Sequence, residues 1–258
     1  MIILKLINPK LLPKDEEFLW RYIDIHKFLN LLNQKKLRFT RMDQFEDTLE
    51  GVPFESLTRL LGYENPLLEL SKSIINYESY KKLSLGLYGR LDEIINIQST
   101  QFVSCWFKEQ RESLAMWNLY SNPDGVAIRI PFGKLKSELI PNSSEKNIIE
   151  YFCGKVNYQN FISIDPYLKN SLSEIDKVSL RKDVSFSHEK EIRFVIKAKN
   201  DKQVKTGIDS NVINLQNLGL QVVCHPKMAD WKKMNIKLAL KKVKLESSFF
   251  ESEMRLRY

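Results

Sequence analysis

The sequence predicts a single α+β domain with a mixed central sheet and an inserted helical layer. Strand-like and helix-like segments both occur along the whole chain, no internal repeat recurs, and no linker-like composition interrupts it. A length of 258 residues allows either one large domain or two smaller ones. Without a linker, one α+β domain is the economical interpretation.

The composition is that of an ordinary globular chain, with 43% hydrophobic and 28% charged residues. Nine glycines and nine prolines are too few for a collagen-like or low-complexity protein. A chain of this length can bury most of its surface, so it needs neither disulfides nor a metal to fold.

The first third predicts strand, helix and strand, followed by a long helical region. Asp24 is placed as the N-cap of a helix that starts at Ile25, and Lys35 and Lys36 suit its C-terminal end. Apolar residues at helical spacing predict the inserted helical layer between Pro53 and about Gln98. The strands expected here are 1–7, 18–22 and 37–40.

The remainder mixes short strands and helices. Helices are expected at 112–120, after Pro131, at about 164–183, and from Pro226 at N1 to about Lys242. Residues 200–210 are polar and predict a loop or hairpin tip. The strands expected here are 101–106, 126–130, 151–158, 192–196, 220–223 and 242–250.

The three cysteines, Cys105, Cys153 and Cys224, are odd in number and far apart, which does not suit a secreted disulfide framework. Each lies in an apolar run, so we expect them in the core. The apolar N-terminus is too short for a signal sequence or a membrane span. We therefore expect a cytoplasmic protein without a membrane partner.

Motifs of the established nucleotide and metal sites are missing from the sequence. It contains no phosphate-binding G-x-x-x-x-G-K-[ST], no G-x-G-x-x-G, no H-E-x-x-H and no C-x-x-C. The three histidines, His26, His188 and His225, are distant from one another. No metal site is predicted.

Trp20-Arg21-Tyr22 places a cation within an aromatic strand. Trp20 and Tyr22 share one face, and Arg21 points to the other. Facing a cleft, Arg21 could bind a phosphate through two N–H groups. A solvated arginine on a half-exposed strand is the alternative.

The loop after Thr40 is rich in acids. Asp43, Glu46, Asp47 and Glu50 follow a strand, where functional loops are common. With Mg²⁺ they could serve a nuclease, whereas a solvated turn would explain them equally well.

Tryptophans and short polar residues occur together twice, around Trp106 and in Met116-Trp117-x-x-Tyr120. Such rings can stack on a flat ligand ring. Packing in the core is the competing interpretation.

Glu189 and Glu191 alternate in an extended chain, so both carboxylates would lie on one side, about 7 Å apart. Two carboxylates on one face can stabilise a cationic transition state or act as a general base. An ordinary ion pair between Glu191 and Arg193 is the alternative.

The formal charge of +8 is concentrated late in the chain, where seven lysines between 227 and 244 face one acid, Asp230. This surplus predicts an anionic partner for one helix face. Lys233, Lys237, Lys241 and Lys244 form the candidate nucleic-acid or partner-binding face, opposite an apolar stripe of Trp231, Met234 and Leu238.

These segments together resemble a bacterial and phage family of unknown function, domain-of-unknown-function family 2971. That family is related to the abortive-infection AbiGi-type phage-resistance proteins. The resemblance spans about residues 18–250. The chain departs from the family pattern at Glu46-Asp47-Thr48-Leu49 and at Ile192. The resemblance implies a role in phage–host conflict.

The layout is also similar to the ADP-ribosyltransferase superfamily, including DarT-like enzymes. That similarity implies an NAD-dependent enzyme that modifies a protein or nucleic acid. A non-enzymatic module that binds nucleic acid or a partner protein, and the nuclease, stay as alternatives. By this analogy Glu191, Glu189 and Arg21 are catalytic, and Arg21, Tyr22, Thr40, Trp106, Trp117 and Tyr120 bind NAD.

Overall fold

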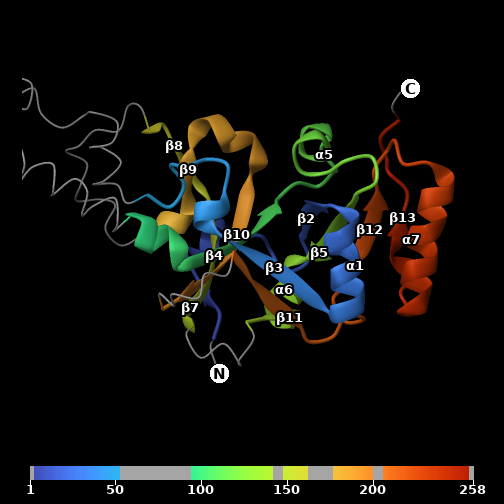
Figure 1. The fold of residues 1–258 in the computed structure, drawn as a ribbon, viewed down its shortest axis with the longest axis horizontal. Coiled ribbons are helices and arrows are strands. Elements are labelled where there is room, and N and C mark those ends of the chain that lie inside the picture. Colours follow the sequence, from blue (N-terminus) through green and yellow to red (C-terminus); the bar gives the residue numbers. More distant parts are fainter. Residues whose placement is uncertain (1–2, 53–93, 142–147, 162–176, 200–205, 256–258) are drawn as a thin grey trace, which may run out of the picture.

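The computed structural model describes residues 3–52, 94–141, 148–161, 177–199 and 206–255. Within these ranges, helices lie against a large mixed sheet, which confirms the α+β class (Figure 1). The predicted helical layer between Pro53 and Gln98 falls outside the described residues, except that 94–99 is helical.

Eleven strands of the described chain form the sheet. It is mixed because β1–β7 and β12–β13 pair in parallel and the other neighbours pair antiparallel. Its main path runs β1 (Lys5–Leu6), β7 (Ile148–Lys155), β10 (Glu191–Ala198), β4 (Gln101–Phe107), β2 (Phe18–Ile23), β5 (Val126–Pro131), β12 (Gln221–Cys224) and β13 (Phe249–Phe250).

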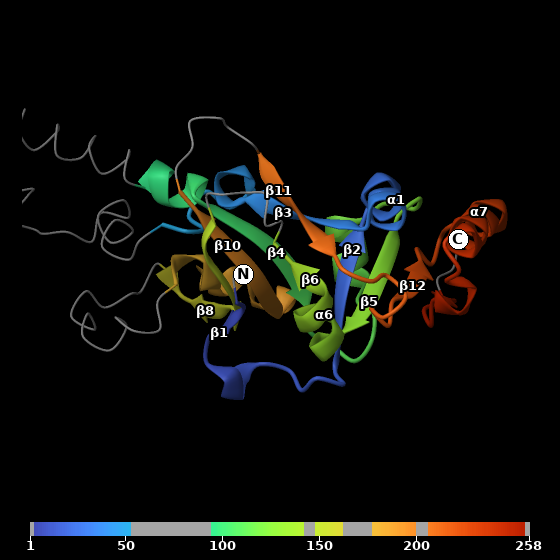
Figure 2. The same cartoon turned by 90° about the horizontal axis from the view of Figure 1, so that it is seen from below.

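A side branch leaves this path at β4. It contains β3 (Lys36–Arg41), β11 (Gly207–Val212) and β6 (Leu139–Ile140). In the described register β4 meets β2 only at Phe107–Trp20, and it meets β3 at Val103–Thr40 and Phe102–Arg41. The sheet therefore forks where β4 changes its partner. Figure 2 shows the β10–β4 half turned relative to the β2–β5 half.

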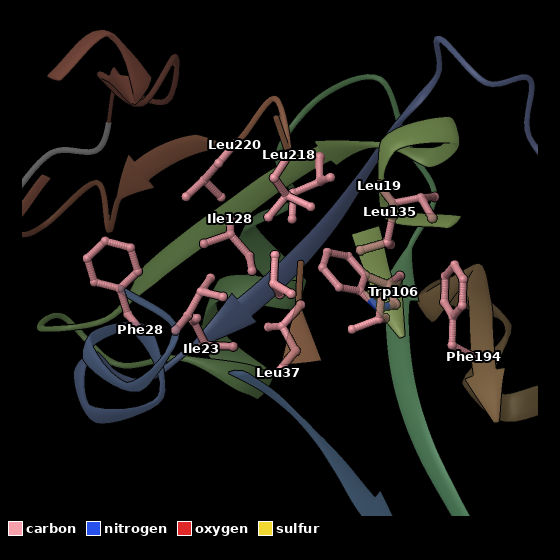
Figure 3. Close-up of a cluster of buried hydrophobic side chains, with 14 of the residues drawn as sticks. Leu19, Ile23, Phe28, Leu37, Trp106, Ile128, Leu135, Phe194, Leu218 and Leu220 are labelled. Carbon is pink, nitrogen blue, oxygen red and sulfur yellow. The ribbon is translucent and has the colours of Figure 1, made fainter. Parts of the chain in front are cut away.

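Alternation along the strands gives the sheet two packed faces. Leu19 and Ile23 join the larger core, to which α1 (Ile25–Gln34), α6 (Phe132–Glu138) and α7 (Asp230–Lys242) contribute. Figure 3 shows side chains of this core, among them Phe28, Ile128 and Phe194. Trp20 and Tyr22 join a smaller core under α5 (Leu114–Tyr120).

The start of α1 follows from one side chain. The Asp24 carboxylate accepts a hydrogen bond from the Lys27 backbone N–H at 2.9 Å, which satisfies a donor that the first helical turn leaves free. The helix ends at Lys35, whose backbone is left-handed with φ 55°. The predicted helix start is confirmed.

Four predicted elements were wrong in whole or in part. Helix α7 begins at Asp230, because Pro226 and Lys227 form a turn closed by Met228 N–H donating to the His225 carbonyl at 2.8 Å. Residues 207–210 belong to strand β11, in which Ile208 and Val212 are buried.

The third error is the end of the helix expected at 164–183. There, Val178–Leu180 is a 3₁₀ turn and Arg181–Asp183 is strand β9, which pairs in parallel with β8 (Asn157–Gln159) in a separate sheet. Residues 162–176 of that expected helix lie outside the described residues. The fourth error is the strand expected at 242–250, of which only Phe249–Phe250 is a strand, because Glu246–Ser248 is a 3₁₀ turn.

Cys153 and Cys224 lie in the larger core, as expected, whereas Cys105 is half-buried. Within the described ranges, no helix combines the length and the apolar character that crossing a bilayer requires.

Candidate functional site

A cavity of about 330 Å³ lies at the fork of the sheet. Its walls come from β2, α1, β3, β4, β10, the acidic loop after β3, α5, and the segment from β9 to β10. Of the predicted site residues, it brings together Arg21, Tyr22, Thr40, Trp106, Tyr120, Glu189 and Glu191.

One wall of the cavity is a buried cluster of acids and bases, which we call the acid–base cluster: Glu50, Lys182, Glu189, Glu191 and Arg193. The Lys182 ammonium lies 2.8 Å from Glu50, 2.5 Å from Glu189 and 3.2 Å from Glu191. The Arg193 guanidinium lies 2.6 Å from Glu191 and 2.8 Å from Glu50. Its five side chains are all nearly inaccessible to solvent.

The cluster combines three carboxyls with two cations, so complete ionisation would leave one negative charge in a poorly solvated place. Burial, together with a hydrogen bond and repulsion from Glu191, raises the pKa of Glu189 to about 7. Burial alone would also raise the pKa of Glu191, but Arg193, a hydrogen bond from Glu189 and Lys182 hold it well below its usual range. Below about pH 7, Glu189 therefore holds the proton of the pair, and Glu191 is ionised.

The backbone at Lys190 explains why two alternate glutamates converge. Glu189 ends a 3₁₀ segment, Val184–Glu189, and Glu191 begins β10. Between them Lys190 is left-handed, with φ 44°, a conformation that is uncommon for residues other than glycine. The reversal directs both carboxylates to the same Lys182 ammonium, so the extended arrangement expected from the sequence was wrong. The alternative of an ion pair between Glu191 and Arg193 is confirmed.

Tyrosine hydroxyls complete the surroundings of the two glutamates. The Tyr120 hydroxyl, at the end of α5, donates to Glu189 Oε1. The Tyr158 hydroxyl accepts from the Glu191 backbone N–H at 2.9 Å. Tyr120 thus contacts a carboxyl of the acid–base cluster directly.

Arg21 bridges the fork. It donates from Nη1 to Ser104 Oγ on β4 at 2.9 Å and from Nη2 to the Arg38 carbonyl on β3 at 2.8 Å. A guanidinium has five N–H groups. Burial lowers the pKa of Arg21, and no carboxylate of the described chain forms an ion pair with it. A half-buried cation on a cavity wall, without a counter-ion among the described residues, is suited to hold an anion.

Asp47 lies on the cavity wall and has one unpaired oxygen. Its Oδ1 accepts from the Leu49 backbone N–H at 2.9 Å. Its Oδ2 is buried and has no hydrogen-bond partner. An unpaired buried acceptor is costly, so a hydrogen bond is left unmade directly behind the cavity wall.

The predicted aromatic contacts are met only in part. Trp117 does not line the cavity: it is fully buried, edge-on to Tyr22 at 4.9 Å, and its Nε1 donates to Glu112 at 2.8 Å. Packing of α5 onto the sheet explains its position. Tyr22 and Trp106 do line the cavity, but both are nearly buried. The half-exposed rings on the walls are Phe45 and Phe186, which sequence reasoning missed.

The acidic loop does not present its carboxylates as one set. Asp43 accepts from Arg41 through both oxygens, at 2.6 and 2.7 Å. Both Glu50 oxygens are held by Lys182 and Arg193. Among the described residues, no three His, Cys, Asp or Glu side chains are grouped as a metal site would require.

The predicted lysine face of α7 is divided. Lys233 lies 3.1 Å from Asp230, and Lys237 lies 3.6 Å from Glu251. Lys241 and Lys244 are exposed at the end of the helix. Two of the four lysines thus already have carboxylate partners.

The fold is α+β, and the buried acid–base cluster forms one wall of a cavity large enough for a ligand. Residues 116–194 of the chain match the family described as "Protein of unknown function (DUF2971)". The matched segment supplies Tyr120, Lys182, Glu189, Glu191 and Arg193. No curated protein and no solved structure matches the chain.

Proposed function

We propose that the cavity is the active site of an NAD-dependent ADP-ribosyltransferase-like enzyme. The observation that carries this proposal is the pairing of a proton-holding Glu189 with an ionised Glu191 in the cavity that also holds Arg21. A pair of carboxyls whose pKa values are pushed apart is a common basis for acid–base roles.

The residue types suit the cleavage of an N-glycosidic bond. The bond between the ribose C1′ and the nicotinamide nitrogen breaks, its electron pair leaves with nicotinamide, and positive charge develops on the ribose. The fixed carboxylate of Glu191 stabilises that charge. The acceptor then bonds to C1′, and its proton passes to Glu189 in the fraction of molecules in which Glu189 is ionised.

Three further features support a nucleotide ligand. Arg21 holds a diphosphate oxygen, Asp47 adds a polar side chain to the wall, and Phe45 and Phe186 offer apolar ring surface. A volume of about 330 Å³ is at the lower end of ligand pockets. The described cavity therefore has room for the nicotinamide riboside phosphate half of NAD.

The acceptor in this proposal is a protein or a nucleic acid of the cytoplasm. The resemblance to AbiGi-type phage-resistance proteins supports a setting in phage–host conflict. Expression of the wild-type chain in a phage-sensitive host should lower plaque numbers, and the Glu189→Gln variant should not.

The direct test is incubation of the purified chain with NAD labelled on the nicotinamide and, separately, on the adenine. We expect release of nicotinamide by the wild type, and transfer of the adenine label when the acceptor is present. Glu189→Gln and Arg21→Lys should each lose at least about tenfold in rate, since the first removes the group that takes the acceptor's proton and the second removes the directed contacts of the guanidinium.

The matched control is Glu109→Gln, which changes a surface glutamate paired with Lys190 away from the cavity. Its rate should equal that of the wild type. If the folded wild-type protein neither binds NAD in calorimetry nor releases nicotinamide, the proposal fails. Loss of activity on adding a chelator would favour the nuclease alternative instead.

A further inference from the structure

The outer face of α7 carries large apolar side chains in solvent. Trp231 is 67% exposed, Met234 54% and Leu238 51%. We call these three residues the apolar stripe. The sequence predicts them opposite the lysine face, but on helix α7 Lys241 follows Leu238 by three residues and is its neighbour on the helix surface. The three are not part of the core: α7 is anchored instead through Ile236 and Leu240.

The spacing of the apolar stripe is that of a recognition helix. Positions i, i+3 and i+7 lie on one side of an α-helix and form a continuous row about two turns long. In Figure 1, α7 lies at the edge of the molecule, with its outer side facing away from the sheet. An exposed row of this kind, including a tryptophan, is typical of a binding surface.

Charge at the border of the apolar stripe indicates the chemistry of its partner. Lys241 and Lys242 are exposed in the last turn, beside Leu238, and neither forms an ion pair with a described residue. The C-terminal end of a helix carries a partial negative charge of about half a unit, which the two full positive charges of these ammonium groups outweigh. They favour a partner that borders its apolar surface with carboxylates.

The surroundings of the stripe disfavour a flat anionic surface. Asp230 is almost fully exposed at the start of α7, and Glu251 and Asp124 lie among the lysines they pair with. Against an anionic lipid layer or a phosphate backbone, these acids would lie at the contact together with the lysines and would repel it. A protein helix can contact the stripe and the lysines of the last turn while avoiding the acids at the first.

We propose that α7 is a docking helix for an acidic amphipathic helix of a protein partner. The apolar stripe contacts the apolar face of that helix, and Lys241 and Lys242 contact its bordering carboxylates. This surface is separate from the cavity, since no residue of α7 lines it.

Trp231 provides the measurement. Of the four tryptophans, the other three are at most 3% exposed, so a change in fluorescence on binding reports mainly on Trp231. The probe is a synthetic helical peptide without tryptophan, with leucines on one face and glutamates bordering them. We expect saturable binding with a blue shift of the emission, weakened by added NaCl.

Variants separate the two halves of the proposal. Leu238→Ala and Met234→Ala should each weaken binding of the peptide about five- to tenfold. The double change Lys241→Glu with Lys242→Glu should lose the glutamate peptide and gain a peptide with lysines in place of the glutamates. Leu119→Ala, which changes an exposed leucine on α5, is the matched control and should bind as the wild type does.

Three outcomes would overturn the proposal. The first is a scrambled peptide of the same composition that shifts the emission as strongly as the helical one. The second is tighter, stripe-dependent binding to vesicles of equal parts phosphatidylserine and phosphatidylcholine, or to a duplex DNA oligonucleotide, than to the peptide. The third is binding of the variants at the wild-type level while circular dichroism shows them folded.

Discussion

The acid–base cluster and the surface of α7 use the same residue types to opposite effect. In the cluster, Lys182 and Arg193 contact Glu50, Glu189 and Glu191 away from solvent. On α7, Lys233 and Lys237 pair with Asp230 and Glu251 at similar or longer distances, but in water. The comparison teaches that burial, more than distance, decides what a charge contributes, because solvent screens the second set.

Arg193→Ala is expected to have the largest effect. It leaves Glu50 and Glu191 without one buried cation each and removes a bond to the Ser179 carbonyl at 2.9 Å. Breaking a buried pair by removing one partner costs about 3–5 kcal/mol of unfolding free energy. Urea denaturation measures this loss, and a loss under about 1 kcal/mol would contradict the contrast with α7.

The pH dependence of stability should come next. The folded state holds a proton on Glu189 up to about pH 7, whereas the unfolded chain releases it near 4.5. The folded state therefore binds more protons between these values, and this group's contribution to stability is lost as pH rises through the window. We expect a decline of roughly 1–3 kcal/mol from this group.

Urea denaturation across that pH range tests the expectation, with Glu189→Gln as the partner measurement. The variant cannot titrate at this position, so its stability should decline less than that of the wild type. Parallel pH profiles for the two proteins would show that Glu189 does not hold the proton.

Asp24→Ala gives an intermediate case, since the Asp24 carboxylate is half-exposed but accepts a hydrogen bond at the start of α1. The change leaves the Lys27 N–H without its side-chain acceptor. Loss of an N-cap costs about 1 kcal/mol. In thermal and urea denaturation, the loss of unfolding free energy should lie between those of Arg193→Ala and Lys237→Ala. Asp24→Asn should keep most of the stability.

Lys237→Ala should have the smallest effect. It removes an exposed ion pair with Glu251 at 3.6 Å and a contact of the ammonium over the Phe249 ring at 4.3 Å. We expect a change within about 0.5 kcal/mol in urea denaturation. A loss as large as that of Arg193→Ala would remove the basis of the comparison.

Local patterns predicted much of the fold, because alternation and helix caps act within a few residues. The strand from Phe18, the helix from Asp24 and the strand at Ile192–Ile196 follow from such signals. The strand at 207–212 did not, since its polar sequence is stabilised by pairing with β3, a contact distant in the chain.

The candidate site was predictable in part for the same reason. Arg21 stands out locally as a charge within an aromatic run, and Glu189 and Glu191 as alternate acids before an apolar strand, and the fold places all three on one cavity. Lys182 was missed because its segment was expected to be helical, whereas β9 turns it toward three glutamates. Trp117 was assigned to stacking because sequence alone does not distinguish a ring in a cleft from one in the core.

The left-handed backbone at Lys190 makes the middle position of the Glu-x-Glu motif informative. Asparagine, aspartate and glycine tolerate this conformation, whereas β-branched residues strongly resist it. A relative with valine or isoleucine at this position would keep both glutamates in its sequence and lose their convergence on the ammonium. Among homologous chains, the residue type between the two glutamates should therefore distinguish those in which both carboxylates reach the ammonium from those that have the two glutamates in sequence only.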